Sequence, residues 1–223
     1  MIKIGIDSRI LAVCPLIKIG MLSANVVNSD TPDALWQEIE DETTKIASRY
    51  QLLEINKRPA IAATRKLYKS LGKDPGRYRV SSEALCRRII RGLGLYRLST
   101  LIDIVNLVSV RSGYAISGLD ADKIVGEALI MGVGEKDEQY CAIGRGMLNI
   151  EGLPVYRDDV GGVATPTSDE ERTKFTLDTT RVQININAFA PEMPVDDALA
   201  WTASLLEKYA QATNIETKIV TDF

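Results

Sequence analysis

The sequence GLGLYRLSTLIDIVNLVSVRSGYAISGLDADKIVG, residues 92–126, decides the fold. Between residues 98 and 110 the apolar side chains recur at the i, i+3, i+4 and i+7 spacing of one helix face. Asp103 and Asn106 belong to a narrow polar strip on the same segment. We therefore predict a largely buried helix that ends at Gly113 and directs an acid and an amide toward one place. Asp103 has a second interpretation, in which its carboxylate satisfies local backbone donors within the core.

Patterns on either side of this helix predict one α+β domain over residues 1–223. Its parts are an N-terminal region of strands and an acidic helix (1–56), basic helices with the central helix (57–113), and a β-rich region (114–223). Further helices are predicted at 30–50, 58–72, from 81 or 82 onward, and at 194–213. Strands are predicted at 1–6, 16–27, 124–133, 153–157, 175–177, 181–188 and 216–221. Residues 181–188 alternate apolar and polar side chains, which is typical of a strand with one dry and one polar face.

Composition narrows the classes of function. The chain has 223 residues, of which 45% are hydrophobic and 26% charged, as in ordinary soluble globular proteins. We expect a cytoplasmic protein, because no run is long and apolar enough for a membrane helix and no secretory signal precedes the first strand. The three cysteines lack metal-ligand spacing and are expected to be reduced structural thiols. The absence of histidine excludes Ser-His and Cys-His catalysis and histidine-bound zinc.

Positive charge is concentrated in one region. Residues 57–97 contain twelve Lys or Arg and two acids, a net charge of +10, although the whole chain carries −3. Such an asymmetry favours an anion-facing surface with RNA as the partner, while solvated faces of two helices are the simpler alternative. The residues predicted to contact RNA phosphates are Arg65, Lys69, Arg87, Arg88 and Arg91.

Other short motifs exclude functions rather than suggest them. Gly132-Val133-Gly134 and Gly144-Arg145-Gly146 lack both the Walker lysine pattern and a complete GxGxxG, so ATP and dinucleotide cofactors are not expected. Asp158 and Asp159 offer two adjacent carboxylates, but a loop pair of this kind is expected to be solvated and lacks the further ligands of a metal site. Gly161 and Gly162 permit either a tight turn or a close approach of backbone amides to a ligand oxygen. We predict no metal and no cofactor.

Several ordered motifs resemble one protein family. LIDIVN at 101–106, Gly113 and DADKIVG at 120–126 are similar to the V-V-D-V-T-N … G … D-L-D-K-I-x-G run in the B3/B4 editing module of the phenylalanyl-tRNA synthetase β subunit. Ser81, Leu85, Arg88, Ile89 and Gly94 resemble the lead-in of that module, with one extra residue before the glycine. Residues 160–162 and 182–189 resemble its M-G-G and V-x-L-E-x-A-x-F elements. The matches span about half the chain.

The resemblance implies a layered α+β fold with a sheet or sandwich core flanked by helices. It also implies a free-standing editing domain that binds tRNA and hydrolyses a mischarged aminoacyl ester, with neither DNA nor a membrane as partner. Aminoacylation is not expected, because the aminoacylating centre of such synthetases lies on another subunit. The catalytic candidates are Gly161, Gly162 and Asn106, and the candidates for substrate binding are Asn106, Ser117, Asn185 and Asn187.

Two departures from the family pattern affect the expected chemistry. Ser117 occupies the position of the pocket histidine, and Asn185 that of the glutamate expected to recognise a tyrosine hydroxyl. Serine cannot replace imidazole as a base and an amide carries no charge, although both still form hydrogen bonds. A substrate other than the tyrosyl ester is therefore expected. A non-catalytic module that binds RNA or an amino acid is the alternative.

Overall fold

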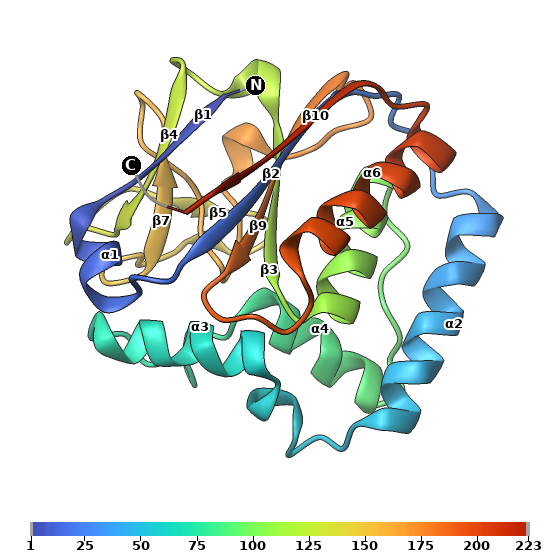
Figure 1. Cartoon of the computed structure of the whole chain (residues 1–223), viewed down its shortest axis with the longest axis horizontal. Coiled ribbons are helices and arrows are strands. Elements are labelled where there is room, and N and C mark those ends of the chain that lie inside the picture. The colour runs from blue at the N-terminus through green and yellow to red at the C-terminus, as the bar shows by residue number, and fades with distance from the viewer. Residues whose placement is uncertain (1, 222–223) are drawn as a thin grey trace.

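Two four-stranded sheets pack face to face in the computed structural model, which describes residues 2–221 (Figure 1). The strands are β1 (Lys3–Ile6), β2 (Lys18–Asn25), β3 (Ala115–Asp120), β4 (Ala128–Val133), β5 (Cys141–Ala142), β6 (Gly146–Met147), β7 (Pro154–Arg157), β8 (Gly162–Ala164), β9 (Arg181–Ala188) and β10 (Thr213–Val220). The first sheet has the order β1-β4-β7-β8, with β1 and β4 parallel. The second is antiparallel, in the order β10-β2-β9-β3, and β5 pairs with β6.

Helices cover the face of the second sheet that points away from the first (Figure 1). The α-helices are α1 (Ser8–Val13), α2 (Asp33–Arg49), α3 (Pro59–Ser70), α4 (Ser81–Ile90), α5 (Thr100–Ser112) and α6 (Val195–Ala210), of which α1 packs against β4 of the first sheet instead. Helices α5 and α6 lie on the sheet, and α2 and α4 pack against α5. The expected α+β class with a sheet core is confirmed. Among residues 2–221, none of the helices combines the length and hydropathy that crossing a bilayer requires.

The alternation predicted for residues 181–188 is confirmed by strand β9. Val182, Ile184 and Ile186 belong to the cluster that packs against the helices. Asn185 and Asn187 lie on the opposite face, between the sheets, and are fully buried. The polar face of this strand is therefore dry as well, and its amides must find partners inside the protein.

The central helix forms as predicted, but Asp103 and Asn106 on its polar strip have different roles. Gly113 closes α5 with a φ of +77°, which a glycine adopts without steric cost. Asp103 is buried and accepts hydrogen bonds from Thr31 Oγ1 (2.5 Å) and the backbone N–H of Leu98 (3.1 Å). Its carboxylate thus holds the start of α5 to the segment before α2, so the structure favours the core interpretation. The expectation that Asp103 and Asn106 point to one place is wrong.

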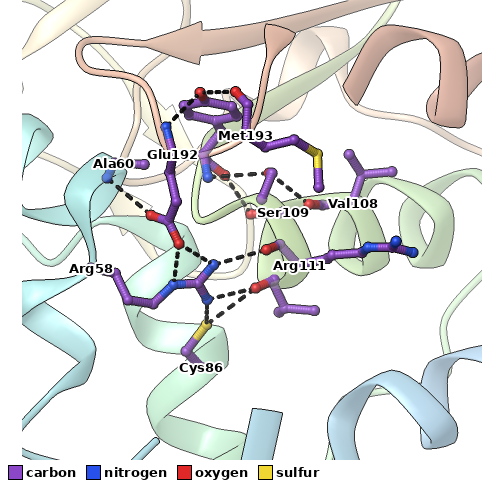
Figure 2. Close-up of polar contacts among 11 residues, drawn as sticks. Arg58, Ala60, Cys86, Val108, Ser109, Arg111, Glu192 and Met193 are labelled. Carbon is purple, nitrogen blue, oxygen red and sulfur yellow. Dashed lines mark hydrogen bonds and ion pairs between the residues drawn. The ribbon is translucent and has the colours of Figure 1, made fainter. Parts of the chain in front are cut away.

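Buried Arg58 fixes the other end of α5 (Figure 2). Its guanidinium donates to the carbonyl oxygens of Val110 (2.6 Å) and Arg111 (2.9 Å), which are free because the helix ends there. Glu192 accepts a further bond from Arg58 Nε (2.7 Å) and so neutralises the buried cation. Both ends of α5 are therefore held by buried charged groups.

The strands β3 and β8, and the helix α1 on the first sheet, were not predicted. Residues 115–120 do not alternate cleanly because Gly118 interrupts the run. A Cβ at Gly118 would lie 2.5 Å from the ring of Phe175, so only glycine permits that close packing. Phe175 itself lies in a loop, and the strand predicted at 175–177 does not form. The predicted serine cap of α4 is also absent, since Val80 occupies the N-cap position.

Candidate functional site

A pocket of about 240 Å³ opens between α4, α5, the edge strand β3 and the segment 165–175. Its walls are mainly apolar and come from Leu85, Leu98, Ile102, Val105, Ile116, Ile143 and Phe175. Polar groups enter from Ser81, Asn106, Ser109, Thr165, Ser168, Asp169 and Lys174. A concave apolar site with a few polar groups is the usual form of a small-ligand pocket.

Asp169 is the titratable group that this geometry singles out. Its carboxylate lies along the free edge of β3, where Oδ2 accepts the backbone N–H of Gly118 (3.2 Å) and the Ser117 hydroxyl donates a second bond. Burial raises the pKa of Asp169 from the ordinary value of 3.8 to about 7, and the two hydrogen bonds offset only part of that rise. The pocket cation, Lys174, pairs with Glu171. A carboxyl group that is half ionised near neutral pH can take or give a proton there.

A tight turn places Asp169 in the pocket. Thr165 Oγ1 accepts the backbone N–H groups of Thr167 (3.2 Å) and Ser168 (3.1 Å), and its hydroxyl donates to the Ser168 carbonyl oxygen (2.9 Å). The hydroxyl of buried Tyr140 also donates to that carbonyl oxygen (2.7 Å). Sequence reasoning missed Asp169, although a Thr-Pro-Thr-Ser turn ahead of an acid is the signal that could have directed attention to it.

Asn106 is the one predicted site residue that lines the pocket. It projects from the middle of α5 and is half-buried. Its amide forms no hydrogen bond with any other residue in the described range 2–221. An amide held in an apolar wall without a protein partner is available to a ligand.

Ser117 and Asn185 lie behind Asp169 rather than in the pocket. They are register partners on β3 and β9, and their side chains share the face between the two sheets. Asn185 Oδ1 accepts a bond from Gln183 Nε2 (2.7 Å), but Asn185 Nδ2 and Gln183 Oε1 are buried without a partner among residues 2–221. A polar row thus runs from the pocket carboxylate through Ser117 to two amides that are not fully bonded.

Asn187 has a different environment, although it shares a strand face with Asn185. Its Oδ1 accepts the hydroxyl of Tyr156 (2.6 Å), which comes from the first sheet, and its Nδ2 donates to the Ala115 carbonyl oxygen (2.9 Å). Asn187 therefore joins β7, β9 and β3 and is fully used in doing so.

Gly161 and Gly162 do not line the pocket. They follow a turn held by Asp158, which accepts the backbone N–H of Gly161 (3.1 Å) together with two bonds from Arg172 (2.9 Å each). A Cβ at Gly162 would lie 2.9 Å from the ring of Tyr140, so this glycine permits close packing.

The expectation that both acids of this turn are solvated is wrong for Asp158, which is buried and paired, whereas Asp159 is exposed.

The five basic residues predicted to contact RNA differ in burial and in their partners. Arg65 and Arg87 are half-buried, and each donates to the buried carboxylate of Glu83 at 2.8 Å. Lys69 and Arg91 are exposed.

Arg88 lies over the ring of Tyr96, with 3.8 Å between its Cζ atom and the ring centroid. Arg91 follows the last turn of α4, the helix that also contributes Ser81 and Leu85 to the pocket, whereas Lys69 lies on α3, which does not line it.

Comparisons with a solved structure and with a family model identify the fold and the family of this chain. The chain aligns over 99% of its length with 54% of the crystal structure of an N-terminal fragment of the phenylalanyl-tRNA synthetase β-subunit from Pyrococcus horikoshii. The TM-score is 0.50 and the sequence identity 16%, so the likeness concerns the fold, and the chain spans about half of that fragment. Residues 63–200 match the family model described as the B3/4 domain, and the chain belongs to that family. Among curated protein sequences, none matches the chain significantly.

Proposed function

We propose that this protein hydrolyses the ester bond of an aminoacyl-tRNA, with the aminoacyl group bound in the pocket beside Asp169. The observation that carries the proposal is a carboxyl group with a pKa of about 7 in the wall of a mainly apolar pocket. Strongly shifted groups of this kind are concentrated at catalytic sites. Membership of the B3/4 domain family and the fold shared with a synthetase fragment support a substrate related to tRNA.

Asp169 acts as general base in the proposed reaction. Its carboxylate takes a proton from a water molecule as that water attacks the ester carbonyl carbon. The tetrahedral intermediate then collapses, the bond between the acyl carbon and the ribose oxygen breaks, and the ribose hydroxyl leaves with the proton returned by Asp169. The products are a free amino acid and an uncharged tRNA.

Asn106 supplies the hydrogen bond to the oxygen that becomes negative. Its amide is unpaired and faces the same pocket, whereas the N–H of Gly161 is engaged by Asp158. A positioned donor of this kind contributes about a hundredfold to acyl-transfer rates. Gly161 and Gly162 have no direct part in the reaction in this proposal.

The pocket walls favour an amino acid with an apolar side chain. Leu85, Ile102 and Val105 offer no partner for a phenolic hydroxyl, and the family glutamate is replaced by Asn185 behind the pocket. Ser117 donates to the Asp169 carboxylate and is a positioning residue that orients it, and Asn185 lies behind Ser117 as its register partner. Asn185→Ala should therefore lower the rate of hydrolysis of every substrate more than the affinity for tRNA.

A deacylation assay over a panel of mischarged tRNAs tests the proposal. Wild-type protein should release an apolar amino acid above the uncatalysed rate, and Asp169→Asn should abolish most of that release. Asp178→Asn is the matched control, because Asp178 is an exposed aspartate with the same change of charge.

A non-catalytic binding module is the second candidate, favoured by the serine at the position of the family histidine. Binding of tRNA or an amino acid without release of any ester at excess protein would establish it in place of the hydrolase.

A further inference from the structure

An exposed tyrosine with a guanidinium on one face stands beside the pocket. Tyr96 is 57% exposed, and the guanidinium of Arg88 lies over its ring at 3.8 Å. Arg88 also donates to the Tyr96 hydroxyl (3.0 Å) and to the Leu93 carbonyl oxygen (3.3 Å), so both side chains are held in place. A fixed aromatic ring with one free face loses little conformational entropy when a planar ligand stacks on it.

Two independent elements place this pair at the rim of the pocket. On α4, Ser81 and Leu85 line the pocket, and Arg88 continues the same helix face one turn further. On the loop before α5, Leu98 lines the pocket and Tyr96 lies two residues earlier.

The surroundings favour a polyanion with planar groups. Arg91 is exposed on the same side of α4, and Arg97, exposed next to Tyr96, pairs with exposed Asp33. The Arg88 Nε atom is buried without an acceptor among residues 2–221. Single-stranded nucleic acids are bound by this combination of aromatic ring, guanidinium and surrounding positive charge.

We propose that Tyr96 and Arg88 form a stacking platform for an unpaired base at the 3′ end of an RNA. This inference rests on the proposed function, in which the ester at that 3′ end enters the adjoining pocket. The base covers the free face of the Tyr96 ring, while Arg88 supports the opposite face and Arg91 lies near the phosphates. The platform therefore selects a single-stranded end over a blunt duplex.

The test uses two uncharged RNA hairpins that differ only in a single-stranded 3′ overhang. Wild-type protein should bind the overhanging hairpin more tightly than the blunt one. Tyr96→Ala should weaken binding of the overhanging hairpin about 5- to 150-fold, the range measured for loss of one base–aromatic stack, and leave the blunt hairpin unaffected. Tyr96→Phe should retain tight binding. Tyr209→Ala, which removes a tyrosine on α6, a helix that does not line the pocket, should have no effect.

The outcomes separate this inference from the hydrolase proposal. Equal affinities of wild type and Tyr96→Ala for the overhanging hairpin, or no binding by wild type, would overturn the platform even if an aminoacyl-tRNA is deacylated. Tyr96-dependent binding without deacylation of any mischarged tRNA would refute the hydrolase and leave the platform standing.

Discussion

Asp158 is buried and Asp169 half-buried, both on turns that flank strand β8, but their carboxylates have opposite electrostatic environments. Asp158 receives two bonds from Arg172 and three from backbone N–H groups, and these bonds lower its pKa despite burial. Asp169 receives one backbone bond and one hydroxyl bond, and burial raises its pKa to about 7. The number and charge of the donors therefore decide whether a buried carboxylate stabilises a turn or can exchange protons.

Two other pairs of like residues in this protein also differ in how fully their polar groups are paired. Asn187 has two good partners and joins the sheets, whereas Asn106 has none and faces the pocket. Arg87 is paired with Glu83, whereas Arg91 is exposed. The satisfied member of each pair serves the fold, and the unsatisfied member is the candidate for binding or chemistry.

The largest expected contrast is the pH dependence of stability. The folded-state pKa of Asp169 is raised, so well below pH 3.8 both the folded and unfolded states are protonated and Asp169 does not change the free energy of unfolding. As pH rises from about 4 to about 7 the unfolded state ionises first, and the free energy of unfolding should fall by about 4 kcal/mol in total. Asp169→Asn should remove this loss in urea unfolding measured at a series of pH values.

Asp158 should show the opposite sign in the same experiment. Its folded-state pKa is lowered, so its stabilisation is present above its ordinary pKa of 3.8 and is lost as pH falls through the lowered value. Equal slopes for the Asp158→Asn and Asp169→Asn variants would contradict the distinction between the two carboxylates.

At constant neutral pH, Asp158→Asn should destabilise the protein by about 3 kcal/mol, because Arg172 loses its charge partner and three backbone donors lose part of their acceptor. Asp159→Asn is the control, since Asp159 is exposed, and should change the free energy of unfolding by less than about 0.5 kcal/mol. Urea unfolding measures both. A loss below 1 kcal/mol for Asp158→Asn would show that the turn does not depend on its charge.

The amide pair should separate stability from activity. Asn187→Ala should lower the free energy of unfolding by about 2 kcal/mol, because the Tyr156 hydroxyl and the Ala115 carbonyl lose their partner. Asn106→Ala should leave stability within about 0.5 kcal/mol and lower kcat/KM for ester hydrolysis about a hundredfold. A large stability loss in Asn106→Ala with normal turnover would reverse the assignment.

The smallest expected difference is between charge reversal at exposed Arg91 and at paired Arg87. Arg91→Glu should weaken tRNA binding a few-fold and reduce the salt dependence of the binding constant, because an exposed charge no longer releases a phosphate counterion. Arg87→Glu should instead destabilise the fold, since it places a second carboxylate beside buried Glu83. Salt titrations of binding and thermal unfolding distinguish the two results. The distinction fails if both variants lose the same affinity and remain equally stable.

Long regular patterns made part of this structure predictable. Residues 181–188 alternate so regularly that the bounds of β9 were correct, and Gly113 ended α5 because few other residues adopt its backbone angle. Strand β3 was missed because its glycine is required by a tertiary contact, the packing of Phe175 on Gly118, and this glycine interrupts the alternation.

The candidate site was less predictable for the same reason. Asn106, which lines the pocket, was predicted from its place on the polar strip of a buried helix together with the resemblance to the family motif. Asp169 was not, since a turn rich in Thr and Ser has the same composition whether its acid is solvated or buried against a sheet edge.

The pH profile of single-turnover deacylation tests the central claim most directly. Wild type and Asp169→Asn are compared on a mischarged tRNA bearing an apolar amino acid, with the uncatalysed rate subtracted at each pH. The wild-type rate should rise through an apparent pKa of about 7 and then level, and the variant should be at least a hundredfold slower with no such inflection. A wild-type rate no greater than the uncatalysed one, or an inflection near pH 7 that survives in Asp169→Asn, would contradict the assignment of Asp169 as the general base.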